Sequence, residues 1–196
     1  MKSRGRKIVA IASSTGGPKA LQDLIPLLPS NLNAPVVLVQ HMPAGFTAAL
    51  AKRLDEISQI SVSEAKDEEL IKKGHVYISM GGKHMNVEQT GMGHAIRYSD
   101  EPHREGVKPC ANYMYESLIN CGYEEVICVV LTGMGADGTA GITALREKKK
   151  TTIIVQNEET CTVYGMPKAA VKAGLTDIEL DLQSIAKAII ENAGVY

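Results

Sequence analysis

The sequence contains no tryptophan, and Phe46 is its single phenylalanine. A core without large aromatic rings has to be built from aliphatic side chains, and a chain of 196 residues that is 44% hydrophobic supplies enough of them for one domain. The chain also lacks an excess of charge of one sign, because its formal net charge is -1. We therefore expect neither nucleic acid nor an anionic membrane surface as a partner.

Long hydrophobic runs and closely spaced cysteine pairs are missing as well. The apolar run at residues 8–12 is shorter than a signal-peptide core of about 7–15 residues or a membrane span of about 20. None of the four cysteines forms a CxxC pair of the kind that indicates a zinc ribbon or a thioredoxin-type site. We expect a cytoplasmic protein with reduced thiols, no metal and no membrane insertion. Residues 1–6 are interpreted as a basic tail or linker remnant before one domain at residues 7–196.

Short apolar segments alternate with amphipathic ones along most of the chain. Strands are predicted at residues 8–12, 36–40, 126–131 and 152–156, and helices begin at Pro18, near Phe46 and at Pro109 and cover residues 139–148, 167–173 and 182–192. This alternation predicts a doubly wound α/β fold, with a mostly parallel sheet and helices on both faces. At residues 76–98, closely spaced glycine turns instead predict three short strands in a small antiparallel hairpin excursion.

Three reactive side chains follow predicted strands, where ligands bind in an open parallel sheet. Ser14 follows the first strand, His41 follows the second, and Asp137 lies in the glycine-rich turn after residues 126–131. A serine, a histidine and a carboxylate at one edge of a sheet are the components of an acyl-transfer triad. The small residues Ala12 and Gly16 around Ser14 also suit the tight turn of a nucleophile elbow, although the match to G-x-S-x-G is degenerate.

Each of these residues has a structural alternative. Ser14 and Asp137 each precede a predicted helix and are candidate N-caps, and a loop carbonyl could satisfy His41. A rival function comes from residues 133–138, which match G-x-G-x-x-G and have Glu158 where a ribose-binding acid would stand. Asp137 would repel a pyrophosphate bound in that turn, so a dinucleotide-binding protein ranks second.

The other titratable candidates have weaker patterns. No metal-ligand spacing joins His75, His84, His94 and His103, which are expected at the surface or in turns. Cys110 begins a predicted helix, where its pKa could be lowered, but we expect a small packed residue.

Four motifs in a fixed order carry a family resemblance. They are SSTGGP at residues 13–18, QHMP at 40–43, LTGMGADG at 131–138 and YGMP at 164–167. Together they resemble the catalytic domain of the CheB family of chemotaxis receptor protein-glutamate methylesterases, from about residue 7 to about residue 191. The resemblance implies a doubly wound α/β fold and hydrolysis of γ-glutamyl methyl esters on the cytoplasmic helices of chemoreceptors. It also implies release of methanol, deamidation of some receptor glutamines, and no cofactor.

Site residues follow from the resemblance by motif position. Ser14 corresponds to the nucleophile, His41 to the general base and Asp137 to the carboxylate that orients the histidine, while Thr15 and the backbone amide of Met134 lie at the oxyanion and substrate-binding positions.

The sequence departs from the family pattern in places. Ala12 and Ser13 stand where Gly-Ala is usual, and Asn112 and Asn157 stand where Asp is common. These departures put the substrate preference in doubt more than the activity. We expect a monomer, with a receiver domain in cis or in trans as a further partner. A catalytically silent receptor-binding domain is the remaining alternative.

Overall fold

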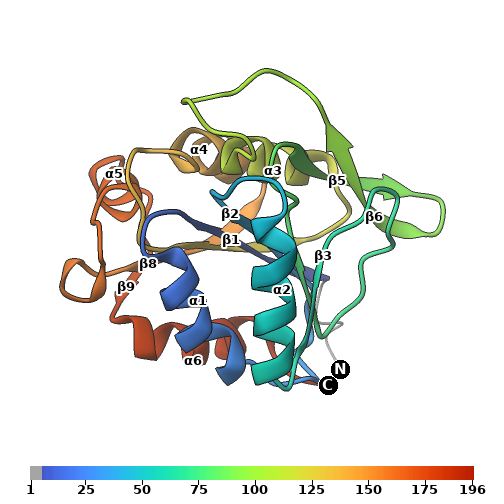
Figure 1. Ribbon diagram of the computed structural model, residues 1–196, viewed down its shortest axis with the longest axis horizontal. Helices are drawn as coiled ribbons and strands as arrows, with labels where there is room; N and C mark the ends of the chain where they lie inside the picture. The colour runs from blue at the N-terminus through green and yellow to red at the C-terminus, as the bar shows by residue number, and fades with distance from the viewer. Residues whose placement is uncertain (1–5) are drawn as a thin grey trace.

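The computed structural model describes residues 6–196 and has a seven-stranded parallel sheet at its centre (Figure 1). The strands lie in the order β3-β4-β2-β1-β7-β8-β9. Their bounds are β1 (Lys7–Ser13), β2 (Val36–Gln40), β3 (Ser61–Glu64), β4 (His75–Ile78), β7 (Glu125–Val130), β8 (Lys150–Gln156) and β9 (Ile178–Leu180). All neighbouring strands run parallel, which confirms the predicted class of sheet. Except for Arg6, the tail expected at residues 1–6 lies outside the described residues.

Helices cover both faces of this sheet (Figure 1). On one face lie α1 (Gly17–Leu24), the short 3-10 helix Ile25–Leu27, α2 (Phe46–Ile57) and α6 (Leu182–Ala193). On the other lie α3 (Ala111–Ser117), α4 (Thr139–Lys148) and α5 (Met166–Lys172). Two further 3-10 helices are Leu118–Asn120 and Glu158–Thr160. Among residues 6–196, no helix has the length and apolar character that crossing a membrane requires.

Two hydrophobic cores hold the layers together, and one of them buries Tyr77 and Tyr115, so the prediction of a core built from aliphatic side chains is wrong for that face. Along β1, Val9 and Ile11 enter the core under α1, α2 and α6, whereas Ile8 and Ala10 enter the core under α3, α4 and α5. This alternation follows from the two-residue period of a strand whose two faces are both covered. The predicted doubly wound fold is therefore confirmed.

The segment at residues 76–98 corrects one prediction. β4 belongs to the parallel sheet, between β2 and β3, and only β5 (His84–Thr90) and β6 (Gly93–Ser99) form an antiparallel hairpin. The prediction failed here because β3 has the sequence SVSE, whose polar residues hid the strand that pairs with β4. Likewise β9, three residues long at the sheet edge, follows the strand that was expected to be last.

The sequence predicts one apolar side of α2 that includes Phe46, Leu50, Leu54 and Ile57, but Phe46 is 61% exposed. The buried positions of that helix are Thr47, Leu50, Ala51 and Leu54. Leu50 and Leu54 are therefore buried as expected, and Thr47 rather than Phe46 begins the buried face, with i, i+3, i+4, i+7 spacing.

Two histidines predicted at the surface or in turns are buried instead. The His94 ring stacks on Tyr123 with ring centroids 4.0 Å apart, and its Nε2 accepts a hydrogen bond from the Gly122 amide at 3.0 Å. His84 accepts a hydrogen bond from the Cys110 amide at 3.2 Å. Both rings thus accept hydrogen bonds from backbone amides of segments distant in the sequence. The sequence around each histidine does not indicate these contacts.

Candidate active site

The three sequence-predicted reactive residues lie at one edge of the sheet. β2, β1 and β7 are neighbours and run parallel, so their carboxyl ends meet at the same edge. Ser14 directly follows β1, His41 directly follows β2, and Asp137 lies in the loop between β7 and α4. This edge is the usual ligand-binding edge of an open α/β sheet.

Backbone hydrogen bonds, and not the hydroxyl of Ser14, hold the turn that contains Ser14. The Ser14 amide donates to the Thr132 carbonyl at 3.0 Å, which ties the turn to the loop after β7. The N-cap of α1 is Gly16, with φ of 80°, and no side chain caps that helix. The N-cap interpretation of Ser14 is therefore wrong, and its half-buried side chain has no capping role.

Gln40 joins the Ser14 turn to the His41 loop. Its Nε2 donates to the carbonyl oxygens of Ser14 at 2.9 Å and of His41 at 3.2 Å. Its Oε1 accepts a 2.6 Å hydrogen bond from the hydroxyl of Ser13, which is fully buried. The second hydroxyl beside Ser14 is thus bonded to the Gln40 amide and belongs to the support of the turn. Gln40 directly precedes His41 in the sequence, but nothing in the pattern indicated this bridging role.

His41 and Asp137 are paired directly at this edge. His41 Nε2 lies 2.6 Å from Asp137 Oδ2, and the carboxylate is 3% exposed. The loop-carbonyl interpretation of His41 is therefore wrong. Asp137 is not the cap of α4 either, because Gly138, with φ of 97°, occupies the N-cap and no side chain caps that helix.

The start of α3 supplies further donors to the carboxylate. The Ala111 amide donates to Oδ2 at 2.7 Å, and the Asn112 amide and the Cys110 thiol each donate to Oδ1 at 3.0 Å. Burial raises the pKa of Asp137, but the hydrogen bonds from His41, Cys110 and Ala111 outweigh it and leave that pKa below its usual range. The carboxylate is therefore ionised at neutral pH, which places a proton on His41 Nε2 and leaves Nδ1 as the basic nitrogen.

Ser14 is brought to the same edge without being hydrogen-bonded to the histidine. Among the described residues, no hydrogen bond joins Ser14 Oγ to the His41 ring. Catalytic hydrogen bonds are often long in substrate-free sites and tighten when substrate binds. Thr15 is exposed beside Ser14, and its carbonyl accepts from Thr132 Oγ1 at 2.9 Å. Met134 is 73% exposed on the loop after β7.

The first and last amides of the glycine-rich turn at residues 133–138 donate hydrogen bonds within the protein. The Gly133 amide donates to the Val163 carbonyl and the Gly138 amide to Asn112 Oδ1, both at 3.0 Å. Asn112 Oδ1 also accepts from the Gly141 amide at 2.8 Å. Because these two amides are engaged and the turn carries the buried, anionic Asp137, it is poorly suited to hold a pyrophosphate, and the dinucleotide-binding interpretation is not favoured.

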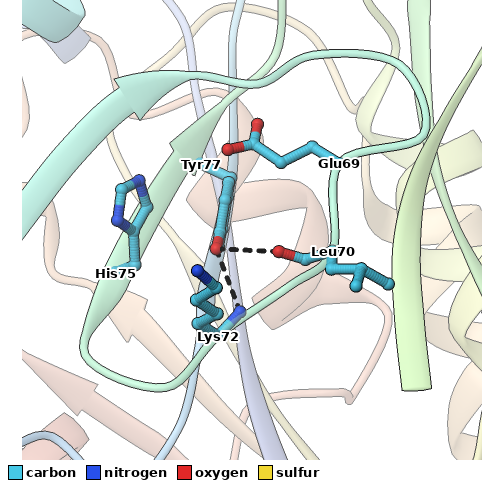
Figure 2. A pocket seen from close by; sticks show the side chains of 5 residues that line it. All are labelled: Glu69, Leu70, Lys72, His75 and Tyr77. Carbon is cyan, nitrogen blue, oxygen red and sulfur yellow. Dashed lines mark hydrogen bonds between the residues drawn. The ribbon is translucent and has the colours of Figure 1, made fainter. Parts of the chain in front are cut away.

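A pocket outside this edge is lined by Glu69, Leu70, Lys72, His75 and Tyr77 (Figure 2). The Tyr77 hydroxyl accepts from the Lys72 amide at 2.9 Å and donates to the Leu70 carbonyl at 3.3 Å, so it fastens the loop before β4. His75 begins β4, which places the pocket toward the amino end of that strand. Within residues 6–196, no group of three His, Cys, Asp or Glu side chains is arranged to hold a metal ion.

A parallel sheet with a serine turn and a histidine–carboxylate pair at its carboxyl edge is typical of α/β serine hydrolases. Residues 9–189 match the CheB methylesterase family, and the chain belongs to that family.

Similar proteins agree with this assignment. The chain is 49% identical over 187 residues to the protein-glutamate methylesterase/protein-glutamine glutaminase of Bacillus subtilis (strain 168), covering 94% of this chain and 52% of the relative. It is 46% identical to the protein of the same name from Geobacillus kaustophilus, covering 95% and 54%. The crystal structure of the Thermotoga maritima CheB methylesterase catalytic domain superposes with a TM-score of 0.92 at 40% identity, covering 95% of this chain and 98% of that one. The chain spans about half the length of the curated relatives it matches.

Proposed function

We propose that this chain is a serine hydrolase that removes methyl esters from glutamate residues of chemoreceptors and releases methanol, with deamidation of receptor glutamines as a related activity. The observation that carries the proposal is the 2.6 Å contact between His41 and the buried carboxylate of Asp137, beside the Ser14 turn, in a chain of the CheB methylesterase family. The names of the relatives support both activities.

The geometry supports acyl transfer in two steps. His41 Nδ1 takes the proton of the Ser14 hydroxyl as Oγ attacks the ester carbonyl. The C–O bond to the methyl group's oxygen then breaks, and the same proton passes from His41 to the departing methoxide, which leaves as methanol. Water hydrolyses the resulting Ser14 ester with His41 again as the base, which returns a glutamate carboxylate and the free hydroxyl.

Asp137 and Met134 have electrostatic roles in this proposal. The anionic carboxylate of Asp137 fixes the tautomer of His41 and stabilises the imidazolium that forms during each proton transfer. The backbone amide of Met134 is the oxyanion donor. Within the described residues it donates no hydrogen bond to another group, and it follows Gly133, which packs against Ser14. Such a donor contributes on the order of 10²–10³ in rate. Thr15 lies at the substrate-binding side of the turn.

The proposed substrate also implies a location in the cell and two partners. We place the protein in the cytoplasm, with the methylated cytoplasmic helices of chemoreceptors as its substrate partner and a receiver domain, in cis or in trans, as a regulatory one.

The test is methanol release from chemoreceptor membranes that carry labelled methyl groups. Wild-type protein is expected to release labelled methanol in proportion to enzyme concentration. Binding of the chain to those membranes without any release would contradict the proposal and favour a catalytically silent receptor-binding domain.

Ser13→Ala is expected to leave methanol release within a few-fold of the wild type. The variant removes the donor to the buried Gln40 Oε1, so the free energy of unfolding should fall by about 1–3 kcal/mol. Urea denaturation and methanol release measure the two effects. Loss of activity in a folded Ser13→Ala protein, with activity kept in Ser14→Ala, would instead make Ser13 the nucleophile.

Gly133→Ala is expected to impair catalysis by displacing Ser14. A Cβ at this position would lie 2.7 Å from Ser14 Cβ and 2.5 Å from Met166 Sδ. Movement of a reacting group by about 1 Å costs on the order of 10²-fold in rate, so we expect a fall of that size in kcat for methanol release. Gly91→Ala is the matched control, because a Cβ there meets nothing within 4 Å. Wild-type kcat in Gly133→Ala would contradict the placement of Ser14.

A further inference from the structure

The thiol of Cys110 lies against the carboxylate of Asp137. Cys110 is fully buried just before α3, and its Sγ is 3.0 Å from Asp137 Oδ1. Burial, together with the neighbouring charge of Asp137, raises the pKa of Cys110 to about 12. The thiol therefore keeps its proton at neutral pH and donates it in a hydrogen bond, and it lacks the thiolate character that a reactive cysteine needs.

This thiol completes the set of donors around the carboxylate. Oδ2 accepts from the Ala111 amide and pairs with His41, while Oδ1 accepts from the Asn112 amide and the Cys110 thiol. The two amides belong to one rigid helix start and hold the carboxylate from one side. The thiol engages the oxygen that does not face His41, and so opposes a rotation of the carboxylate that would turn its other oxygen away from His41.

His84 anchors the backbone that presents the thiol. The Cys110 amide donates to His84 Nδ1 at 3.2 Å, and His84 Nε2 lies 3.1 Å from the Pro102 carbonyl. Because Nδ1 accepts, the proton of this ring is on Nε2, where it donates to the carbonyl. His84 is fully buried at the start of β5. A continuous series of contacts therefore runs from the hairpin through Cys110 and Asp137 to His41.

We propose that Cys110 is a positioning residue of the hydrolytic site: its thiol holds Asp137 in the orientation in which Oδ2 accepts from His41, and His84 fixes the backbone of Cys110. This inference rests on the proposed function, because it assigns Cys110 a part in the same reaction. The thiol touches neither the substrate nor the reacting atoms and acts only through Asp137.

The first measurement is steady-state methanol release by Cys110→Ala and Cys110→Ser. The alanine variant should lower kcat about twofold to tenfold with KM unchanged, which is the range that one hydrogen bond supports. The serine variant keeps a donor of similar size and should recover most of the loss. Cys110→Val fills the volume without a donor and repeats the test if the alanine variant is unstable. Cys121→Ala is the matched control, because this second buried thiol donates to the Val87 carbonyl at 3.2 Å, away from Asp137.

The second measurement needs no activity. In histidine-labelled protein, NMR follows the His41 Nε2 proton, which should be protected from exchange with water in the wild type. We expect faster exchange in Cys110→Ala, and wild-type behaviour in Cys110→Ser and Cys121→Ala. Unchanged exchange together with unchanged kcat in Cys110→Ala would overturn the inference and leave the proposed function intact. A wild type that releases no methanol would overturn the proposed function, while the exchange of the His41 proton would still decide whether Cys110 positions Asp137.

Discussion

Replacing Ser14 by alanine should lower methanol release by on the order of 10⁴- to 10⁶-fold while the protein remains folded. The reason for the large effect is that no acyl intermediate can form without the hydroxyl, and the remaining groups only polarise the ester and bind it. The side chain of Ser14 caps no helix, so its loss should change the free energy of unfolding by no more than about 0.5 kcal/mol.

Because Ser14→Ala should lose activity without losing stability, the experiment distinguishes loss of the nucleophile from unfolding. Methanol release and urea denaturation are measured on the same preparation, with Ser13→Ala as the neighbouring hydroxyl that should keep its activity. Ser14→Ala with more than about a tenth of wild-type release would show that another group attacks the ester. Equal loss in both variants would indicate damage to the turn, because Ser13 supports it through Gln40.

The sequence predicted the sheet best where strands are buried on both faces. β2 begins and ends at the predicted residues, and β1 and β7 differ from their predictions by a residue at each end, because each is a continuous apolar run between turn residues. β3 and β9 were missed because they are short strands at the two edges of the sheet. Edge strands are only partly buried, so they keep polar residues and lack a continuous apolar run. Edge strands are selected by their neighbours in the sheet, and that information is not local to the segment.

The same distinction applies to the site. Ser14, His41 and Asp137 could be placed at one edge because parallel strands share a carboxyl edge, whatever their distance in sequence. The support around Asp137 could not be predicted, because Cys110 reaches it across 27 residues by a lateral contact from a helix start. The choice between a cap and a free side chain at Ser14 was also beyond the sequence, since it depends on the positive φ of Gly16.

Asp137→Asn should lower kcat by on the order of 10³- to 10⁴-fold with little change in KM. All four groups around the carboxylate are donors: the Ala111 and Asn112 amides, the Cys110 thiol and His41 Nε2. An asparagine has one accepting oxygen, so in either orientation its NH₂ group faces two donors. Facing His41, it would force the wrong tautomer. If the NH₂ group instead faced the Asn112 amide and the Cys110 thiol, the amide oxygen would accept from His41. That oxygen is neutral and would not stabilise the imidazolium.

The same substitution should also lower stability, in a way that depends on pH. At neutral pH the crowded donors should cost about 1–3 kcal/mol of unfolding free energy. Because the pKa of Asp137 is lowered in the folded state, the carboxylate's contribution is present above the ordinary aspartate pKa of about 3.9 and is lost as the pH falls through the folded value. The difference in stability between wild type and Asp137→Asn should therefore shrink in acid, as urea denaturation across pH would measure.

Asp177→Asn is the control for Asp137→Asn, because Asp177 also accepts a backbone amide, from Ile153 at 2.9 Å, and pairs with Arg146. It should keep full kcat. Full activity in Asp137→Asn would contradict the assigned role. Since the two aspartates differ in whether a histidine shares the carboxylate, a loss of kcat confined to Asp137→Asn would locate the catalytic contribution in the contact with His41.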